Sequence, residues 1–134
     1  MLIKRQVLIK SIVTEALKKD LIEKFNKLID LSEKRLNEIN SEEKKFLLTA
    51  PSLEPNYLQA IRGRLKEQKE EEERVKESLI RERENIKNLK EGEIYLHGYV
   101  DSFVDFKEGD DFFKKLEKAE ITLKDGKIIE IKNE

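Results

Sequence analysis

The chain of 134 residues contains no cysteine, which excludes a disulfide framework and any chemistry that needs a thiol. Its single histidine, His97, stands in no HxxxH or HExxH spacing, so the residues give no pattern for a zinc site. The five glycines form no GxGxxG or GxxxxGK phosphate loop. We therefore expect a protein that is not an enzyme and that has no catalytic residue, metal site, cofactor or small-molecule substrate.

Long hydrophobic runs are also absent. No stretch reaches about 18 uninterrupted apolar residues, the length that spans a bilayer. The first residues alternate between apolar and polar and are interrupted by Lys4, Arg5 and Lys10, unlike the continuous apolar region of a signal peptide. We expect a cytoplasmic protein with no membrane partner.

Aromatic residues are few and charged residues abundant, at 7% and 43% of the chain. Such a composition favours a thin core and a large solvated surface, as a helical hairpin has. The 28 lysines and arginines balance 29 aspartates and glutamates, so the net charge of −1 gives no general case for nucleic-acid binding.

Residues 14–90 are predicted to form an antiparallel coiled-coil hairpin. In the second half, seven of ten positions at alternating spacings of three and four are apolar, from Leu58 to Leu89. A weaker stripe of the same kind runs from Phe25 to Phe46. Pro51 and Pro55 cannot lie inside a helix, so the chain turns at residues 49–55. This connection is short, which makes the helices antiparallel neighbours.

The two stripes also predict how the helices are aligned. Folding about the turn sets Ser32 against Glu72 and Leu36 against Gln68, with apolar pairs on either side. A polar layer inside an apolar seam costs stability but fixes the register. Thr14 is the expected N-cap of the first helix.

Residues 1–13 and 91–134 are predicted to form a small β-domain into which the hairpin is inserted. The segment around Ile3–Ile9 alternates like a strand, and residues 93–106 form one bent strand or two strands joined at Gly98. Residues 107–111 form a turn and residues 112–116 a short helical turn. We expect a small antiparallel β-barrel or curled sheet of four to five strands, which makes the fold class α+β.

The last hairpin, residues 120–132, allows two turns. A two-residue turn at Asp125-Gly126 sets Leu123 opposite Ile128. A three-residue loop with Gly126 in the left-handed conformation places one apolar set on a single face, and we favour it for that reason. That set is Ile121, Leu123, Ile129 and Ile131.

Large apolar residues gather at the predicted hairpin tip. One interpretation is a docking site for a protein partner, and the other is that these residues cap the coiled coil by packing on each other. The residues are Phe46, Leu47, Leu48, Leu53 and Tyr57.

Two charged groups have competing interpretations. A basic set flanks the tip and suits either an RNA backbone or a solvated helix surface: Lys44, Lys45, Arg62, Arg64 and Lys66. An acidic set suits either Ca²⁺ or Mg²⁺ or an ordinary turn: Asp101, Asp105, Glu108, Asp110 and Asp111. The turn is the stronger interpretation, because the spacing is not that of an EF-hand loop.

Three segments resemble the YlqD family of bacterial proteins. They read VLIKSIVTEALK at residues 7–18, GYVDSFVDFKEGDD at 98–111 and AEITLKDGKIIEI at 119–131. The resemblance implies a cytoplasmic bacterial protein encoded near ribosome-maturation genes, and it brings no activity or catalytic residue.

Two functions remain open. The first is a non-enzymatic protein-interaction or scaffolding module that contacts its partner at the tip, with homo-oligomers also expected. The alternative is an RNA- or ribosome-associated factor that uses the basic flank of the tip.

Overall fold

The computed structural model describes residues 1–133, which fall into two compact units. Of the described residues, 1–19 and 89–133 belong to the first, here called the sheet unit. Residues 20–88 form the second, the helix unit. The chain is therefore an α+β protein in which a helical segment is inserted between strands.

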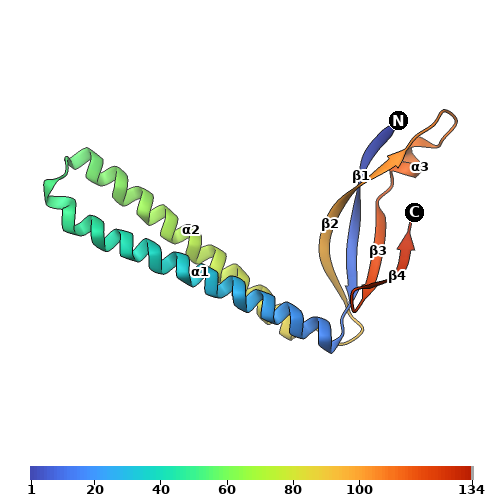
Figure 1. Ribbon diagram of the computed structural model, residues 1–134, viewed down its shortest axis with the longest axis horizontal. Helices are drawn as coiled ribbons and strands as arrows, with labels where there is room; N and C mark the ends of the chain where they lie inside the picture. Colours follow the sequence, from blue (N-terminus) through green and yellow to red (C-terminus); the bar gives the residue numbers. More distant parts are fainter. Residues whose placement is uncertain (134) are drawn as a thin grey trace. The chain divides into compact units, whose positions relative to one another are not determined.

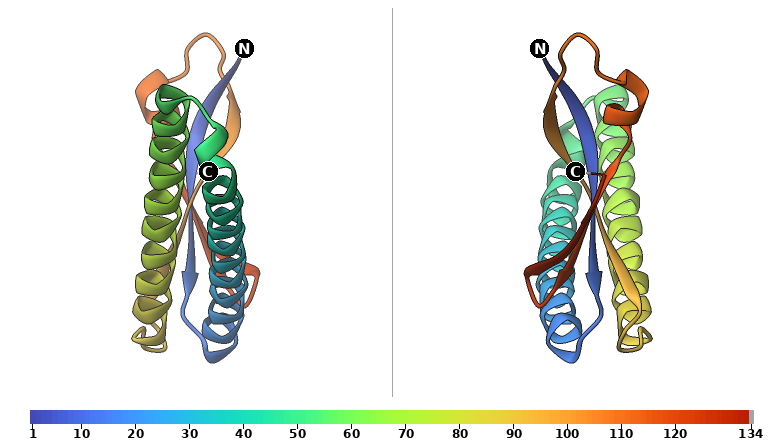
Figure 2. Two further views of the ribbon diagram at one scale, coloured as in Figure 1. Left: turned by 90° about the vertical axis from the view of Figure 1, so that its left-hand side faces the viewer. Right: turned by 90° about the vertical axis from the view of Figure 1, so that its right-hand side faces the viewer.

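The helix unit consists of two long helices that run side by side (Figures 1 and 2). Helix α1 spans Glu15–Thr49 and helix α2 spans Pro55–Lys87. A single 3-10 turn, Ala50–Ser52, lies between them. The break falls where the two prolines predict it, and α2 ends three residues before the predicted end at residue 90.

Side-chain caps define where both helices begin. The Oγ1 atom of Thr14 accepts a hydrogen bond from the backbone N–H of Leu17 at 3.1 Å, as the predicted N-cap requires. The carboxylate of Glu54 accepts bonds from the N–H groups of Asn56 and Tyr57, both at 3.3 Å. Pro55 occupies the first turn of α2, where its missing N–H costs nothing. The turn between the helices therefore has a defined end on the α2 side.

The predicted contact between Ser32 and Glu72 is present. The Ser32 hydroxyl donates to Glu72 Oε1 at 2.8 Å, and Ser32 is only 2% exposed. Arg64 lies 3.6 Å from Glu42 across the helices, which agrees with the same alignment nearer the turn. The buried apolar residues of the helix unit are Leu21, Ile29, Phe46, Leu65 and Ile86.

The sheet unit is a four-stranded open sheet with the order β2-β1-β3-β4 (Figure 1). Its strands are β1 (Leu2–Ile12), β2 (Ile94–Asp105), β3 (Ala119–Lys124) and β4 (Lys127–Lys132). Strand β1 pairs antiparallel with β2 and parallel with β3, and β3 pairs antiparallel with β4. Val7, Val13 and Ala119 are its buried apolar residues.

A barrel and a curled sheet were the two predicted forms; the closed barrel is wrong, and the pairing is not all antiparallel. The segment from β2 to β3, which includes α3 (Phe112–Leu116), carries the chain to the other side of β1, so β3 runs parallel to β1. Arg5 of β1 holds this crossing by donating to the carbonyl oxygens of Lys115 and Glu117 at 3.2 and 3.4 Å. Strands β2 and β4 thus lie at opposite edges and leave the sheet open.

Strand β2 is continuous, which settles the choice between one strand and two. Ile9 pairs with Gly98 and Lys10 with Leu96, so His97 is the extra residue of a β-bulge. Gly98 has a φ of 115°, a conformation that only glycine adopts readily. The bulge lets His97 Nε2 reach Ser11 Oγ at 2.6 Å. The glycine therefore bends the strand without dividing it.

The favoured three-residue loop in the last hairpin is also wrong. Asp125 and Gly126 both have positive φ, 49° and 82°, as in a two-residue type I′ turn. Leu123 pairs with Ile128 but Thr122 pairs with Glu130, so Ile129 is an extra residue in β4. This bulge restores the pairing of Ile121 with Ile131, the apolar match for which the longer loop was invoked.

We predict that Ser32→Ala lowers the free energy of unfolding by about 1 to 3 kcal/mol, because the Glu72 carboxylate loses its buried donor. Adding Glu72→Leu should restore most of this loss, since an apolar pair then replaces a broken polar one. Urea unfolding followed by circular dichroism measures both. A change below about 0.3 kcal/mol for Ser32→Ala would show that the bond does not hold the helices together.

The sheet unit should lose stability in acid. A hydrogen bond and ion pair from Lys10, at 2.8 Å, lower the pKa of Glu120 below its ordinary 4.5. The pair therefore stabilises the fold above the unfolded-state pKa and is lost as the pH falls through the lower folded-state pKa. Glu120→Gln should flatten the decline of the melting temperature between about pH 5 and pH 3. An unchanged pH profile would contradict this.

Candidate functional site

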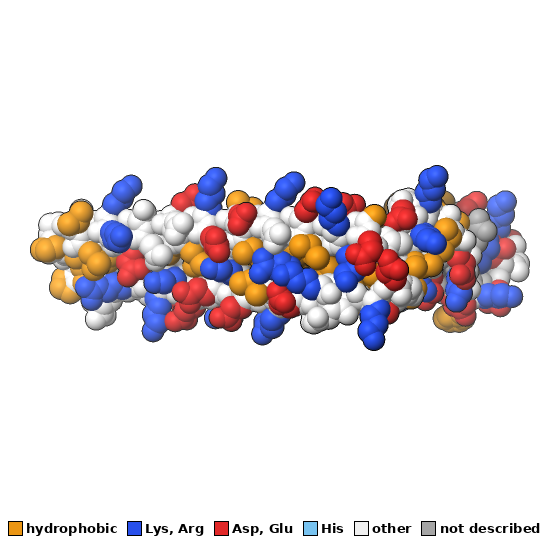
Figure 3. Space-filling model, turned by 90° about the horizontal axis from the view of Figure 1, so that it is seen from below, with side chains coloured by type: hydrophobic (Ala, Val, Ile, Leu, Met, Phe, Trp, Pro, Cys, Tyr) orange, Lys and Arg blue, Asp and Glu red, His pale blue; other side chains and the backbone are white. Residues whose placement is uncertain are grey.

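The residues around the helix turn divide into buried and exposed sets. Leu47, Leu48 and Tyr57 are 51%, 83% and 56% exposed, whereas Phe46 is only 8% exposed and Leu53 is half-buried. Figure 3 shows hydrophobic side chains gathered at this end of the helix pair. The packing interpretation thus holds for Phe46, which closes the seam, whereas Leu47, Leu48 and Tyr57 face solvent.

A groove runs alongside this end of the helices. We call it the tip groove. Its walls combine apolar side chains, three cations and a single carboxylate. The lining residues are Glu43, Phe46, Leu47, Arg62, Leu65, Lys66 and Lys69.

The predicted basic set is split by the structure. Arg62 and Lys66 line the tip groove, while Arg64 pairs with Glu42 at 3.6 Å. Lys44 and Lys45 are exposed and do not line the groove. The tip groove therefore contains two of the five predicted basic residues.

Lys69 belongs to the groove and was missed. It lies in an acidic stretch of the sequence, which concealed it. Its spacing was the available signal, because Arg62, Lys66 and Lys69 recur at intervals of four and three residues and therefore share one face of α2. Within residues 1–133 none of these three cations makes an ion pair or a side-chain hydrogen bond.

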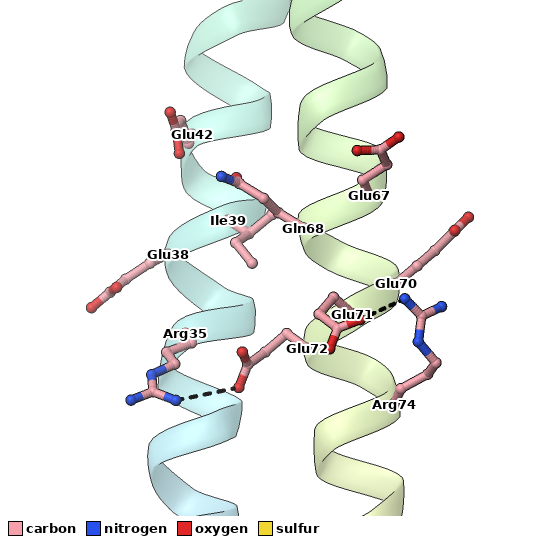
Figure 4. A pocket seen from close by; sticks show the side chains of 10 residues that line it. All are labelled: Arg35, Glu38, Ile39, Glu42, Glu67, Gln68, Glu70, Glu71, Glu72 and Arg74. Atoms are coloured by element: carbon pink, nitrogen blue, oxygen red, sulfur yellow. Dashed lines mark hydrogen bonds and ion pairs between the residues drawn. The ribbon is translucent and has the colours of Figure 1, made fainter.

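A second hollow farther along the helices is acidic (Figure 4). Glu72 reaches toward α1, where Arg35 lies 3.9 Å from its carboxylate, and Arg74 pairs with Glu71 at 2.7 Å. Glu38 and Glu70 point away from the space between the helices, as residues of a solvated surface do. The lining residues are Arg35, Glu38, Ile39, Glu42, Glu67, Gln68, Glu70, Glu71, Glu72 and Arg74.

Most residues of the predicted acidic set of the sheet unit have a partner within this unit. Asp101 pairs with Lys4 and Asp105 with the N-terminal amine, both at 3.1 Å. Asp111 caps α3. Among residues 1–133 no three or more acidic or histidine side chains gather as metal ligands would. The interpretation as a turn therefore fits Asp110 and Asp111, whereas Asp101 and Asp105 belong to strand β2.

Asp110 shows the same structural role most clearly. A hydrogen bond from Lys115 at 2.7 Å and one from the Lys107 N–H at 2.8 Å lower the pKa of its carboxyl below the ordinary 3.8. Its carboxylate thus ties the turn after β2 to α3. It stays ionised at neutral pH as a structural anion.

The sequence model of the YlqD family, described as YlqD protein, matches residues 1–132. The chain belongs to the YlqD family. This confirms the resemblance of the three segments quoted above. No curated protein matches this YlqD chain.

A solved structure shares the YlqD fold. It is the crystal structure of a protein of unknown function from Synechococcus sp. WH 8102, with a TM-score of 0.87 and 19% identity. The match covers 98% of this chain and 94% of the other. At this identity it supports the fold alone. No helix within residues 1–133 is both long and apolar enough to cross a membrane.

Proposed function

We propose that this YlqD protein is a non-enzymatic interaction module of the cytoplasm, whose coiled-coil hairpin presents its tip to a protein partner. The exposure of Leu47, Leu48 and Tyr57 at the turn is the observation that carries the proposal. Three large apolar side chains in water at one end of a long helix pair are costly unless another surface covers them. Tyrosine is enriched at the centres of protein interfaces, and the two leucines add exposed apolar area.

The arrangement of the helices suits such a role. The seam places Phe46 and Leu65 out of solvent beneath the tip, at 8% and 3% exposure. The exposed residues therefore sit on a packed support, which limits the entropy lost on binding. The cap from Glu54 and the two prolines hold the turn itself.

Self-association is the second part of the proposal, and it concerns the sheet unit. Both edges, β2 and β4, lack a neighbouring strand within the described residues. Leu96, Tyr99 and Phe103 of β2 are 59%, 52% and 67% exposed, and Ile128 and Ile131 of β4 are 57% and 44% exposed. Unpaired apolar edges of this kind favour pairing with a second copy.

An RNA- or ribosome-associated role is the alternative. It is supported by the exposed Lys44, Lys45, Arg62 and Lys66 on both sides of the tip. Two observations weaken this alternative. Arg64 is already paired with Glu42. In addition, Glu43 lines the groove beside the cations. We therefore favour the protein partner.

Leu48→Ser with Tyr57→Ser should abolish capture of a partner from nuclease-treated bacterial lysate while helicity is unchanged. Both side chains are exposed, so their loss should change the free energy of unfolding by less than about 0.5 kcal/mol each. Leu31→Ser, an exposed apolar change elsewhere on α1, is the matched control. Retention of the same partner by the tip variant would refute the proposal.

The RNA alternative makes a separate prediction. Its binding to single-stranded RNA should weaken linearly in a log–log salt plot, with a slope of about −0.7 for each phosphate contact. Arg62→Gln with Lys66→Gln should therefore make the slope shallower by about 1.4. Fluorescence anisotropy measures this. Binding that does not depend on salt, or no binding, would remove the alternative.

A further inference from the structure

We infer that the tip groove accepts an amphipathic α-helix of a partner protein, with acidic side chains flanking its apolar stripe. The inference rests on the proposed function and names the chemistry of the partner. It uses the tip groove, whereas the proposed function uses the exposed residues of the turn. The two can therefore be tested apart.

The walls of the groove suit a third helix. It is lined from both α1 and α2, which lie side by side, and such a furrow between two helices is where a third helix packs in a bundle. Phe46 and Leu65 form an apolar floor, and Leu47 is half-exposed at its edge. From Arg62 to Lys69 the helix rises about 10 Å, which matches two turns of a bound helix. Apolar residues at i, i+3, i+4 and i+7 would fill this length.

The charges select an acidic partner. Arg62, Lys66 and Lys69 line the groove without an ion pair of their own within residues 1–133. Glu43 is the one carboxylate among the lining residues, so the groove is net positive although the whole chain carries −1. Arginine and lysine stems also cover apolar surface while their charged ends stay in water. Each exposed pair adds little affinity, and the row of cations instead sets orientation and partner choice.

The same lining argues against RNA as the occupant. Phosphate backbones gain nothing from the apolar floor of Phe46 and Leu65. Single-stranded bases stack on exposed aromatic faces. Phe46 is the one aromatic residue among those that line the groove, and it is only 8% exposed, while the exposed Tyr57 does not line it. A carboxylate-bearing helix uses both the apolar floor and the cations.

The test uses the full chain and a fluorescein-labelled designed peptide of three to four helical turns. Leucine occupies its i, i+3, i+4 and i+7 positions, and glutamate flanks them. Fluorescence anisotropy should show saturable binding that Lys66→Glu with Lys69→Glu weakens at least about tenfold. Lys44→Glu with Lys45→Glu is the matched control, because these exposed lysines lie outside the groove, and its affinity should stay within about twofold. Circular dichroism verifies that each variant is folded.

Three kinds of result would overturn the inference. The first kind would show that the groove binds any polyanion. It is either equal binding of a peptide whose leucines are replaced by serine, or displacement of the peptide by single-stranded RNA. The second is equal binding of a peptide with lysine in place of glutamate, which would show that the cations select nothing. The third is no peptide binding together with salt-sensitive self-association that requires Lys66 and Lys69, which would assign the groove to a second copy.

The capture experiment separates this inference from the proposed function. Loss of a captured partner in Leu48→Ser/Tyr57→Ser but not in Lys66→Glu/Lys69→Glu would refute the groove and leave the tip standing. Retention by both variants would refute both. Loss in both, together with peptide binding that depends on Lys66 and Lys69, is the result we expect.

Discussion

The hydrogen bond from Ser32 to Glu72 sets how α1 and α2 are aligned, and the surfaces at their turn depend on it. Both groups are largely out of solvent, so any slip of the helices would leave a buried carboxylate without its donor. With the alignment held, Phe46 and Leu65 close the seam and the cations of α2 lie beside Leu47. The Ser32–Glu72 pair in the middle of the helices thus determines which side chains of α1 and α2 line the groove near their end.

The sequence predicted the helix unit well, because its signals are local. The spacing of apolar residues, Pro51, Pro55 and the polar pair Ser32–Glu72 depend only on helical geometry. The sequence located the tip, but it did not show which of the tip side chains are buried and which are exposed. Consecutive helical residues point about 100° apart, so Phe46 is buried while Leu47 and Leu48 are exposed. Lys69 was missed because composition, and not its spacing from Arg62 and Lys66, guided the interpretation.

The strand pairing of the sheet unit was predicted less well. Alternation of apolar residues is the same in an open and a closed sheet, and it does not say which strands pair. The parallel pairing of β1 with β3 depends on where the chain crosses after β2, a long-range contact held by Arg5. Two bulges, at His97 and Ile129, also shift the registers that an unbroken alternation predicts. The type I′ turn and its bulge act together, so the loop could not be chosen from its own residues.

Distances between spin labels would test the alignment most directly, and the absence of cysteine makes site-specific labelling simple. A label at position 42 would be combined in turn with a second label at position 57, 64 or 71. These three positions are spaced seven residues apart along α2. Because Glu42 lies 3.6 Å from Arg64, the 42–64 pair should give the shortest distance. A slip of one heptad moves the helices by about 10 Å, so a shortest distance for 42–57 or 42–71 would contradict the alignment and the tip groove with it.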